Sequence, residues 1–244
     1  MTIITRITPV GDSRRDRPMT TVVLAMSLDG KITDFRYTAA RFSSVADKAH
    51  LEQQIAQVDG VLFGAATLRA YGTTLRITNP ALLEQRQQAG KPPQPVHIVC
   101  SRSATFSPAL PFFRQAVPRW LFTSALGAAQ WQNSPQFEQI CILDAPASSS
   151  PEFDWISGFH YLSTLGWKHL AILGGGTLVA SLLSAQLLDE FWITVCPVLL
   201  GGTTSPTLVA GSGFLQAIAP RLELLNVHQI EHELFLHYRL RHTS

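Results

Sequence analysis

The strongest chemical signal in the sequence is a run of three glycines between an apolar segment and a helix-like segment. Residues 169–184 read HLAILGGGTLVASLLS, and Gly174, Gly175 and Gly176 separate the two parts. Glycine lets a chain turn tightly and approach a ligand without a Cβ in the way. The following helix would present free N–H groups and a positive dipole end, which suit a phosphate. The run is either a phosphate-binding turn or a purely structural one, and it is not a GxGxxG motif.

A second glycine turn follows another short apolar run. Residues 61–67 read VLFGAAT, so a predicted buried strand reaches Gly64 and leads into a predicted helix over residues 65–71. The Thr67 hydroxyl either bonds a phosphate or caps that helix. Two such turns in one parallel sheet are more informative than one, because ligands bind outside the carboxyl ends of the strands.

Two polar residues follow the carboxyl end of a third apolar run. Residues 97–103 read HIVCSRS, which places Ser101 and Arg102 directly after a predicted strand. Arginine suits a phosphate monoester, such as the 2′-phosphate of NADP. The alternative is an arginine in a solvated loop.

A fourth segment combines an acid, a glycine and a lysine. Residues 25–32 read AMSLDGKI, so a predicted strand ends at Asp29-Gly30, a pair that favours a tight turn, and Lys31 follows. The turn is either only structural, or it places the backbone of Ala25 and the Asp29–Lys31 turn beside a ligand.

Short apolar runs alternate with amphipathic segments along the chain, which is typical of βαβ units and a largely parallel sheet covered on both faces. Ser44 followed by Asp47 resembles a capping box at a helix start, and Asn79-Pro80 marks another. We therefore predict an α/β fold with three α/β/α layers, a mostly parallel central sheet and a C-terminal antiparallel hairpin. The predicted strands are 20–27, 60–63, 96–100, 119–123, 139–143, 169–173, 190–200, 221–229 and 233–241, and the predicted helices start near 44, 65, 79, 153 and 177.

The charge distribution limits the classes of partner. The chain has 244 residues and a net charge of +2, and 15% of its residues are charged, against about 25% in an average domain. Residues 1–18 hold four arginines and two aspartates, so the rest of the chain is neutral. A nucleic-acid binder needs clustered cations, and a membrane span needs roughly 18 apolar residues, so neither is predicted. We expect residues 1–18 to be a flexible basic tail and residues 19–244 to form one domain.

The cysteines indicate a reducing compartment. Cys100, Cys141 and Cys196 each lie in an apolar run, their number is odd, and no CxxC spacing occurs. We therefore expect three core thiols and a cytoplasmic protein. No HExxH or Cys/His ligand spacing occurs either, so no metal site is predicted.

Taken in order, these segments resemble the RibD C-terminal family, the reductases of riboflavin biosynthesis, which share a dihydrofolate-reductase-like fold. The resemblance covers about residues 20–241 and is closest to stand-alone, reductase-only members. The sequence shows no H-x-E…P-C-x-x-C pattern of a zinc deaminase. The motifs that carry the resemblance are SLDGKI (27–32), RFSSVADKAHL (41–51), DGVLFGAATL (59–68), LGGGTL (173–178), LLDE (187–190) and CPVLLGG (196–202).

The resemblance implies an NADPH-dependent oxidoreductase and assigns cofactor contacts. The pyrophosphate would lie on the triple-glycine turn, the adenosine 2′-phosphate at the third apolar run, and the nicotinamide near the end of the first strand. The implied cofactor residues are Gly174, Gly175, Gly176, Thr177 and Leu178 at the pyrophosphate, Gly64 and Thr67 along the cofactor, Ser101 and Arg102 at the 2′-phosphate, and Ala25 and Gly202 at the nicotinamide.

The resemblance also implies a phosphorylated small-molecule substrate and a homodimer. Family members reduce the ribose of 5-amino-6-(5-phosphoribosylamino)uracil, with hydride passing to the sugar C1. Lys31 and Asp29 are the catalytic candidates, and Lys31 would polarise the sugar oxygen or hold the substrate phosphate. The apolar strand Phe191–Leu200 would support the dimer interface. The remaining residues implied on the substrate side are Arg41, Ser43 and Ser44.

Two departures from the family pattern leave other functions open. The family carries an acid after the second glycine turn, where residues 67–75 hold no carboxylate, and often a glutamate before the glycines, where Leu173 stands. Both acids are associated with the aminopyrimidine substrate. The alternatives are an NADPH-dependent reductase of another, pteridine-like heterocycle and a non-catalytic NADP-binding paralogue.

Overall fold

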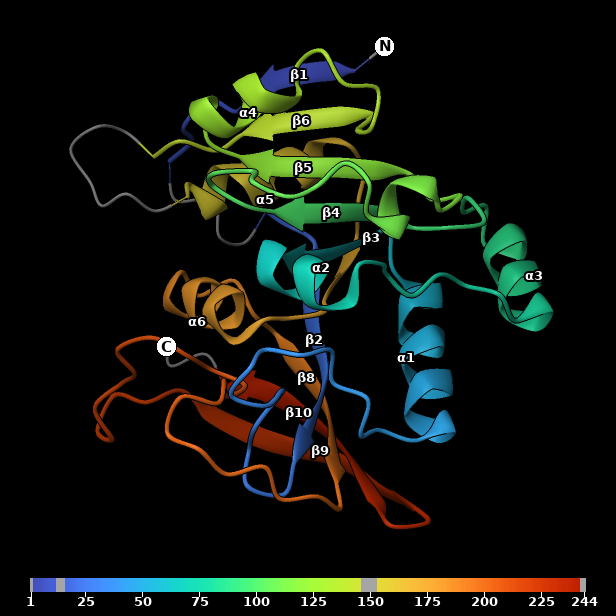
Figure 1. The fold of residues 1–244 in the computed structure, drawn as a ribbon, viewed down its shortest axis with the longest axis vertical. Coiled ribbons are helices and arrows are strands. Elements are labelled where there is room, and N and C mark those ends of the chain that lie inside the picture. The colour runs from blue at the N-terminus through green and yellow to red at the C-terminus, as the bar shows by residue number, and fades with distance from the viewer. Residues whose placement is uncertain (1, 12–15, 146–152, 242–244) are drawn as a thin grey trace.

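Ten strands form one continuous sheet in the computed structural model, which describes residues 2–11, 16–145 and 153–241 (Figure 1). Their order across the sheet is β1-β6-β5-β4-β3-β7-β2-β8-β10-β9. The strands are β1 (Ile3–Arg6), β2 (Met19–Ser27), β3 (Gly60–Gly64), β4 (Val96–Cys100), β5 (Arg119–Thr123), β6 (Gln139–Ile142), β7 (His169–Ile172), β8 (Glu190–Cys196), β9 (Arg221–Ile230) and β10 (Glu233–Arg241).

Strand direction confirms the predicted architecture. Every pair from β1 to β8 is parallel, whereas β10 runs antiparallel to both β8 and β9. Parallel strands all end at the same edge, so the segments that follow β2, β3, β4 and β7 begin at that edge. The hairpin extends the sheet beyond β8.

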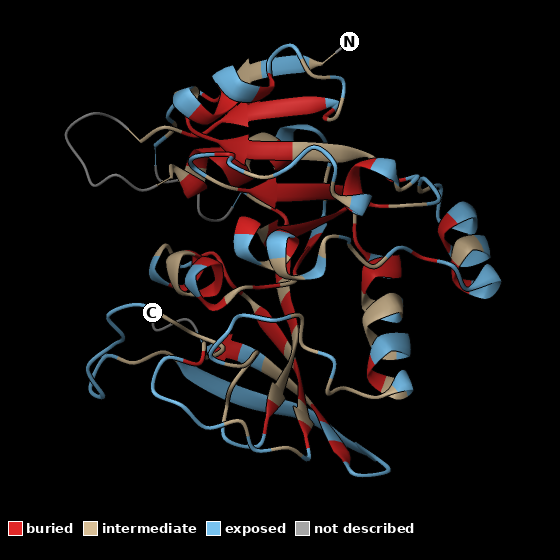
Figure 2. Cartoon of the chain, viewed as in Figure 1, coloured by how far each residue is buried: buried red, intermediate tan, exposed pale blue. Residues whose placement is uncertain are grey.

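Alternating side chains of the central strands enter two separate cores. In β3, Leu62 packs with α5 and α6 on one face, while Val61 and Phe63 pack with α1, α2 and α3 on the other. Figure 2 shows the central strands as buried almost throughout. The helices are α1 (Val45–Gln57), α2 (Ala65–Tyr71), α3 (Pro80–Gln88), α4 (Ala125–Trp131), α5 (Trp155–Thr164) and α6 (Gly176–Ser184), with a 3-10 turn at Pro111–Arg114.

Local capping explains the start of α1, which the sequence predicts. Ser44 accepts hydrogen bonds from the amides of Ala46 and Asp47 at 3.1 and 3.2 Å, and α1 begins at the next residue. The reciprocal bond of the expected capping box is different, because the Ser44 amide donates to Glu233 of β10 at 2.8 Å and not to Asp47. A residue 189 positions away therefore completes the cap.

Part of the segment that was expected to be a flexible N-terminal tail pairs with the sheet. Residues Ile3–Arg6 form β1, which pairs in parallel with β6. Arg17 forms a bidentate pair with Asp189 at 2.6 and 2.7 Å, which ties the segment before β2 to the start of β8. Backbone pairing and this ion pair hold the segment, and residues 12–15 lie outside the described residues.

Two further differences concern the end of one strand and the presence of one helix. The predicted strand 190–200 ends at Cys196, because Pro197 has no N–H with which to continue a ladder. Helix α4 was not predicted from its sequence.

Within the described residues no helix is long and apolar enough to cross a membrane, and no group of His, Cys, Asp and Glu side chains could hold a metal ion. The three cysteines are buried free thiols.

Candidate active site

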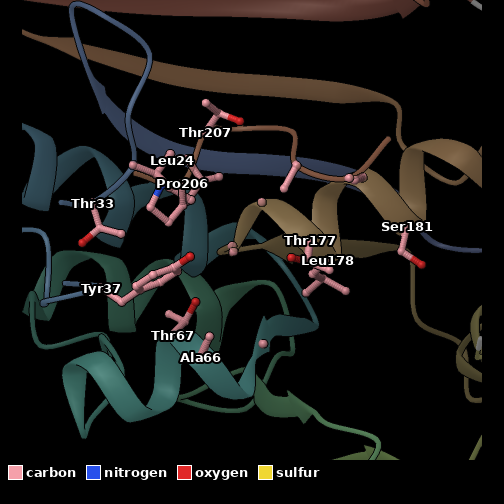
Figure 3. Close-up of a pocket in the computed structure, with 18 of the residues that line it drawn as sticks. Leu24, Thr33, Tyr37, Ala66, Thr67, Thr177, Leu178, Ser181, Pro206 and Thr207 are labelled. Carbon is pink, nitrogen blue, oxygen red and sulfur yellow. The ribbon is translucent and has the colours of Figure 1, made fainter. Parts of the chain in front are cut away.

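A cavity of about 880 Å³ lies at the carboxyl ends of the central strands (Figure 3). The segments that follow β3, β4 and β7 all line it, which is the expected position of a ligand site in an open α/β sheet. Its opposite wall comes from residues 31–40 and 203–214, which contain no helix and no named strand.

The two predicted glycine turns meet in the floor of this cavity. The Gly64 amide donates to the Gly174 carbonyl oxygen at 2.9 Å, and a Cβ on Gly175 would lie 3.7 Å from Thr67 Oγ1. Gly176 is more restricted, since a Cβ there would stand 2.2 Å from the Thr207 carbonyl oxygen. The main chains of these segments therefore approach each other more closely than residues with larger side chains would allow.

Helix α6 points its amino end at the same floor. Its N-cap is Gly175, which has no side chain to accept from the amides of the first turn. These amides and the positive end of the helix dipole suit an anion. Thr177 and Leu178, the first residues after Gly176, also line the cavity (Figure 3).

Arg102 stands at one end of the cavity on a fixed loop. Its carbonyl oxygen accepts from Ser124 Oγ at 2.8 Å, and Ser101 Oγ accepts from the Ala104 amide at 3.0 Å. The guanidinium lies 5.7 Å from the centre of the Phe153 ring. It forms no ion pair with any described carboxylate, so its charge is available to a ligand.

Asp29 anchors the loop that carries Lys31 and does not itself line the cavity. Its carboxylate accepts from the amides of Leu200 and Gly201 at 3.0 and 2.7 Å and from Ser27 Oγ at 2.7 Å. The Ser27 hydroxyl, followed by these amides, lowers the pKa of Asp29 to about 2. Asp29 is therefore a positioning residue in this geometry.

The structure brings most of the predicted site residues together and places the others elsewhere. Ser44 caps α1 and also donates from its hydroxyl to Glu233 at 2.5 Å. The predicted residues that line the cavity are Lys31, Gly64, Thr67, Ser101, Arg102, Gly174, Gly175, Gly176, Thr177 and Leu178, while Ala25, Asp29, Arg41, Ser43, Ser44 and Gly202 do not line it.

Several lining residues were missed because their segments lack a recognisable pattern. Tyr71 lines the cavity, and its hydroxyl donates to the Ala40 carbonyl oxygen at 3.1 Å. Trp155 lines it too and donates from its indole N–H to Ser181 at 2.7 Å. The hydroxyl-rich run GGTTSPT (201–207) is a sequence signal that could have indicated the second segment of the opposite wall.

The charges in the cavity wall have one sign. Lys31 and Arg102 are the charged side chains among its described lining residues, and none of these residues is an aspartate or glutamate. A cavity with unpaired cations and a helix amino end is built to bind anionic groups.

Comparison with known proteins identifies the family. The family model of the RibD C-terminal domain matches residues 18–236. The chain belongs to the RibD C-terminal domain family. Figure 1 shows that this match spans the sheet from β2 through most of the hairpin.

Curated relatives support this membership, two of them over nearly their full lengths. The chain is 28% identical over 200 residues to the 2,5-diamino-6-ribosylamino-4(3H)-pyrimidinone 5′-phosphate reductase of Archaeoglobus fulgidus, covering 82% of this chain and 90% of that one. It is 25% identical over 230 residues to the protein of the same name from Methanothermobacter thermautotrophicus, covering 92% and 99%. The riboflavin biosynthesis protein RibD of Bacillus amyloliquefaciens is 26% identical, and the match covers 89% of this chain but 56% of RibD.

Solved structures show the same fold. A pyrimidine reductase-like protein from Corynebacterium diphtheriae superposes with a TM-score of 0.75 at 22% identity, covering 96% of each chain. The riboflavin biosynthesis reductase of Saccharomyces cerevisiae superposes with a TM-score of 0.67 at 17% identity, covering 93% of this chain and 91% of that one. The predicted α/β architecture of the RibD C-terminal family is thereby confirmed.

The Asp29 anchor predicts a specific acid dependence of stability. The lowered pKa means that the carboxylate stabilises the fold fully above the ordinary pKa of 3.8 and loses this effect as the pH falls towards about 2. We expect Asp29→Asn to reduce the free energy of unfolding at pH 6 and the deficit to shrink between pH 4 and pH 2. Urea unfolding at pH 6, 4 and 3 measures it.

The control for the acid series is Glu138→Gln, which removes an exposed carboxylate that directly precedes β6, away from the Lys31 loop. This variant should reduce the free energy of unfolding only slightly at every pH. A deficit of Asp29→Asn that stays constant down to pH 3 would show that the carboxylate is not the anchor.

Proposed function

We propose that the chain is an NADPH-dependent reductase. The observation that carries this proposal is the meeting of the two glycine turns, through the Gly64–Gly174 hydrogen bond of 2.9 Å, beside the uncapped amino end of α6. The cavity also has an unpaired arginine at one end, which suits the additional phosphate of NADPH. Membership of the RibD C-terminal family supports the same function.

The residues present fit this cofactor along one path. The amides of Gly176, Thr177 and Leu178 would hold the pyrophosphate, because α6 leaves them without a capping side chain. Arg102, with Ser101 beside it, would hold the 2′-phosphate. Bound NADPH would supply a hydride to the substrate, and the protein would orient the two molecules and exclude water from between them.

For the substrate we propose a phosphorylated ribosylaminopyrimidine, such as 5-amino-6-(5-phosphoribosylamino)uracil, reduced at the ribose C1. Relatives named as reductases of 2,5-diamino-6-ribosylamino-4(3H)-pyrimidinone 5′-phosphate support this class. One observation favours a second candidate, a reductase of another heterocycle. The described lining residues hold no carboxylate. Residues 67–75, where the resemblance leads us to expect an acid, hold none, and Leu173 stands where the family often has a glutamate.

We also propose that the protein is a cytoplasmic homodimer. The three cysteines are buried free thiols, as suits a reducing compartment. The expected interface strand Phe191–Leu200 has no free edge in β8, because β8 lies between β2 and β10. The edge strand β9 offers a more accessible surface, because it is exposed along its whole length (Figure 2). By the strand register, its Leu222, Leu224 and Val227 share a face with Leu236 of β10.

Cofactor preference provides the first test. We expect NADPH to raise the melting temperature more than NADH does, since a ligand at 100 times its Kd stabilises by about 2.7 kcal/mol. Arg102→Ala should weaken NADPH binding by about 10-fold or more and leave NADH binding unchanged, because a hydrogen bond to a charged group is worth about 1.5–3 kcal/mol. Fluorescence titration measures both constants.

The matched control for this variant is Arg114→Ala, which removes an exposed arginine outside the cavity. It should keep the full preference for NADPH. An unchanged preference in Arg102→Ala would place the 2′-phosphate elsewhere, and the absence of stabilisation by either nucleotide would refute a nicotinamide cofactor.

Turnover provides the second test. We expect oxidation of NADPH, followed at its absorbance band, with 5-amino-6-(5-phosphoribosylamino)uracil and none with dihydrofolate. The reverse result would favour the pteridine-like candidate. Tight NADPH binding without oxidation by either compound would favour a non-catalytic NADP-binding protein.

The oligomeric state provides the third test. Light scattering coupled to gel filtration should give a dimer for the wild type and a monomer for Val227→Lys, which puts a charge on the apolar face of β9. Asn226→Lys, on the opposite face of the same strand, should stay dimeric. A monomeric wild type would contradict the proposed interface.

A further inference from the structure

Two aromatic rings form a link between helix α6 and the arginine at the end of the cavity. Ser181 of α6 accepts a hydrogen bond of 2.7 Å from the indole N–H of Trp155. The Trp155 ring meets the Phe153 ring edge to face, with 5.0 Å between the centroids and 67° between the planes. The Arg102 guanidinium lies over the Phe153 ring, 5.7 Å from its centroid. All four residues line the cavity, so this aromatic link is part of its wall.

The loops that carry Arg102 and Phe153 are also joined through their main chains. The Arg102 carbonyl oxygen accepts from Ser124 Oγ at 2.8 Å, and the next residue, Ala125, donates its amide to the Asp144 carboxylate at 2.9 Å. Asp144 in turn forms an antiparallel bridge with Phe153. These contacts connect the segments that follow β4, β5 and β6, so the main chains of Arg102 and Phe153 are held relative to each other.

The two ends of the aromatic link differ in burial. Trp155 is 5% exposed and belongs to the core on the α5 and α6 face of the sheet, and Phe153 packs against that core. Arg102 is exposed. A long exposed side chain loses rotamer freedom when it binds a ligand, and this loss reduces the affinity. A ring that the core holds against the guanidinium restricts Arg102 before the ligand arrives, so less freedom remains to be lost.

Contact with a ring leaves the hydrogen-bond donors of an arginine available. The guanidinium N–H groups lie in the plane of the group, and an aromatic ring does not consume them as a carboxylate would. No described carboxylate forms an ion pair with Arg102. Phe153 therefore restrains this side chain and leaves both its charge and its donors to a ligand.

We propose that Phe153, supported by Trp155, is a positioning residue that strengthens the preference of this chain for a nucleotide with a 2′-phosphate. The inference rests on the proposed reductase function, because that function assigns the pyrophosphate to the amino end of α6 and the 2′-phosphate to Arg102. The hydrogen bond from Trp155 to Ser181 attaches the aromatic link to the same helix. The link therefore places Arg102 relative to α6, and a nucleotide without the 2′-phosphate does not benefit from it.

Nucleotide binding tests the role of Phe153 separately from any contribution to folding. In fluorescence titrations of the full chain, Phe153→Leu should weaken NADPH binding about 2- to 5-fold, as expected for the loss of an exposed cation–π contact, and leave NADH binding unchanged. Phe153→Tyr keeps a ring and should retain the wild-type preference. Unchanged affinity for NADH also shows that both variants fold.

A double-mutant cycle with Arg102 identifies the residue through which Phe153 acts. In the Arg102→Ala background, Phe153→Leu should not change the binding of NADPH any further, because the guanidinium that the ring positions is absent. An equal loss of NADPH affinity in both backgrounds would show that Phe153 acts without Arg102, and would overturn the positioning role.

Phe35→Leu is the matched control, because Arg36 lies over the Phe35 ring at 5.4 Å and neither residue lines the cavity. This variant should keep the wild-type preference for NADPH. A full preference in Phe153→Leu, or an equal weakening of NADPH and NADH binding, would also overturn the positioning role. Failure of both nucleotides to bind the wild type would instead refute the proposed reductase function, so the two failures are distinguishable.

Discussion

The close approach of two backbone turns, Gly64 to Gly174, is the constraint on which the rest of the site depends. The two residues are 110 positions apart, and their hydrogen bond of 2.9 Å continues the pairing of β3 with β7 beyond the strands. Because of it, α2 and α6 start side by side and Thr67 faces Gly175. The other side of α6 is equally close to main chain, because Gly176 packs directly on the Thr207 carbonyl oxygen. The cavity floor is therefore fixed by main chain, and side chains need only select the ligand.

The positive charge of the cavity wall results from where the acidic side chains form their ion pairs and hydrogen bonds. Asp189 is occupied by Arg17, Asp59 by Lys91, and Glu190 by His237 and Arg239, and all of these pairs lie away from the cavity wall. Asp29 is occupied by backbone amides. A chain with few charges can therefore have a net charge of only +2 and still leave Lys31 and Arg102 unpaired in one cavity. The electrostatic character of the site depends on the placement of the acids, and the overall charge conceals it.

Features set by neighbouring residues could be predicted from the sequence, and features set by distant contacts could not. The cap at Ser44, the helix start at Asn79-Pro80 and both glycine turns depend on a few adjacent residues, and the structure has them where they were expected. Strand β1 has four residues and a partner 136 positions away, so no local pattern could reveal it. The same reason applies to Asp29 and to Ser44. Each was expected beside the ligand, and the partners that occupy them, Gly201 and Glu233, are 172 and 189 positions away.

The two walls of the cavity are built in different ways, and this difference bears on specificity. The wall proposed for the cofactor consists of strand ends and helix starts, whose geometry the hydrogen-bonded sheet determines. The wall proposed for the substrate consists of residues 31–40 and 203–214, which the Asp29 anchor and the Lys31–Thr207 bridge hold in place. Substitutions in such loops alter few sheet contacts, so they can change the substrate while the cofactor site persists.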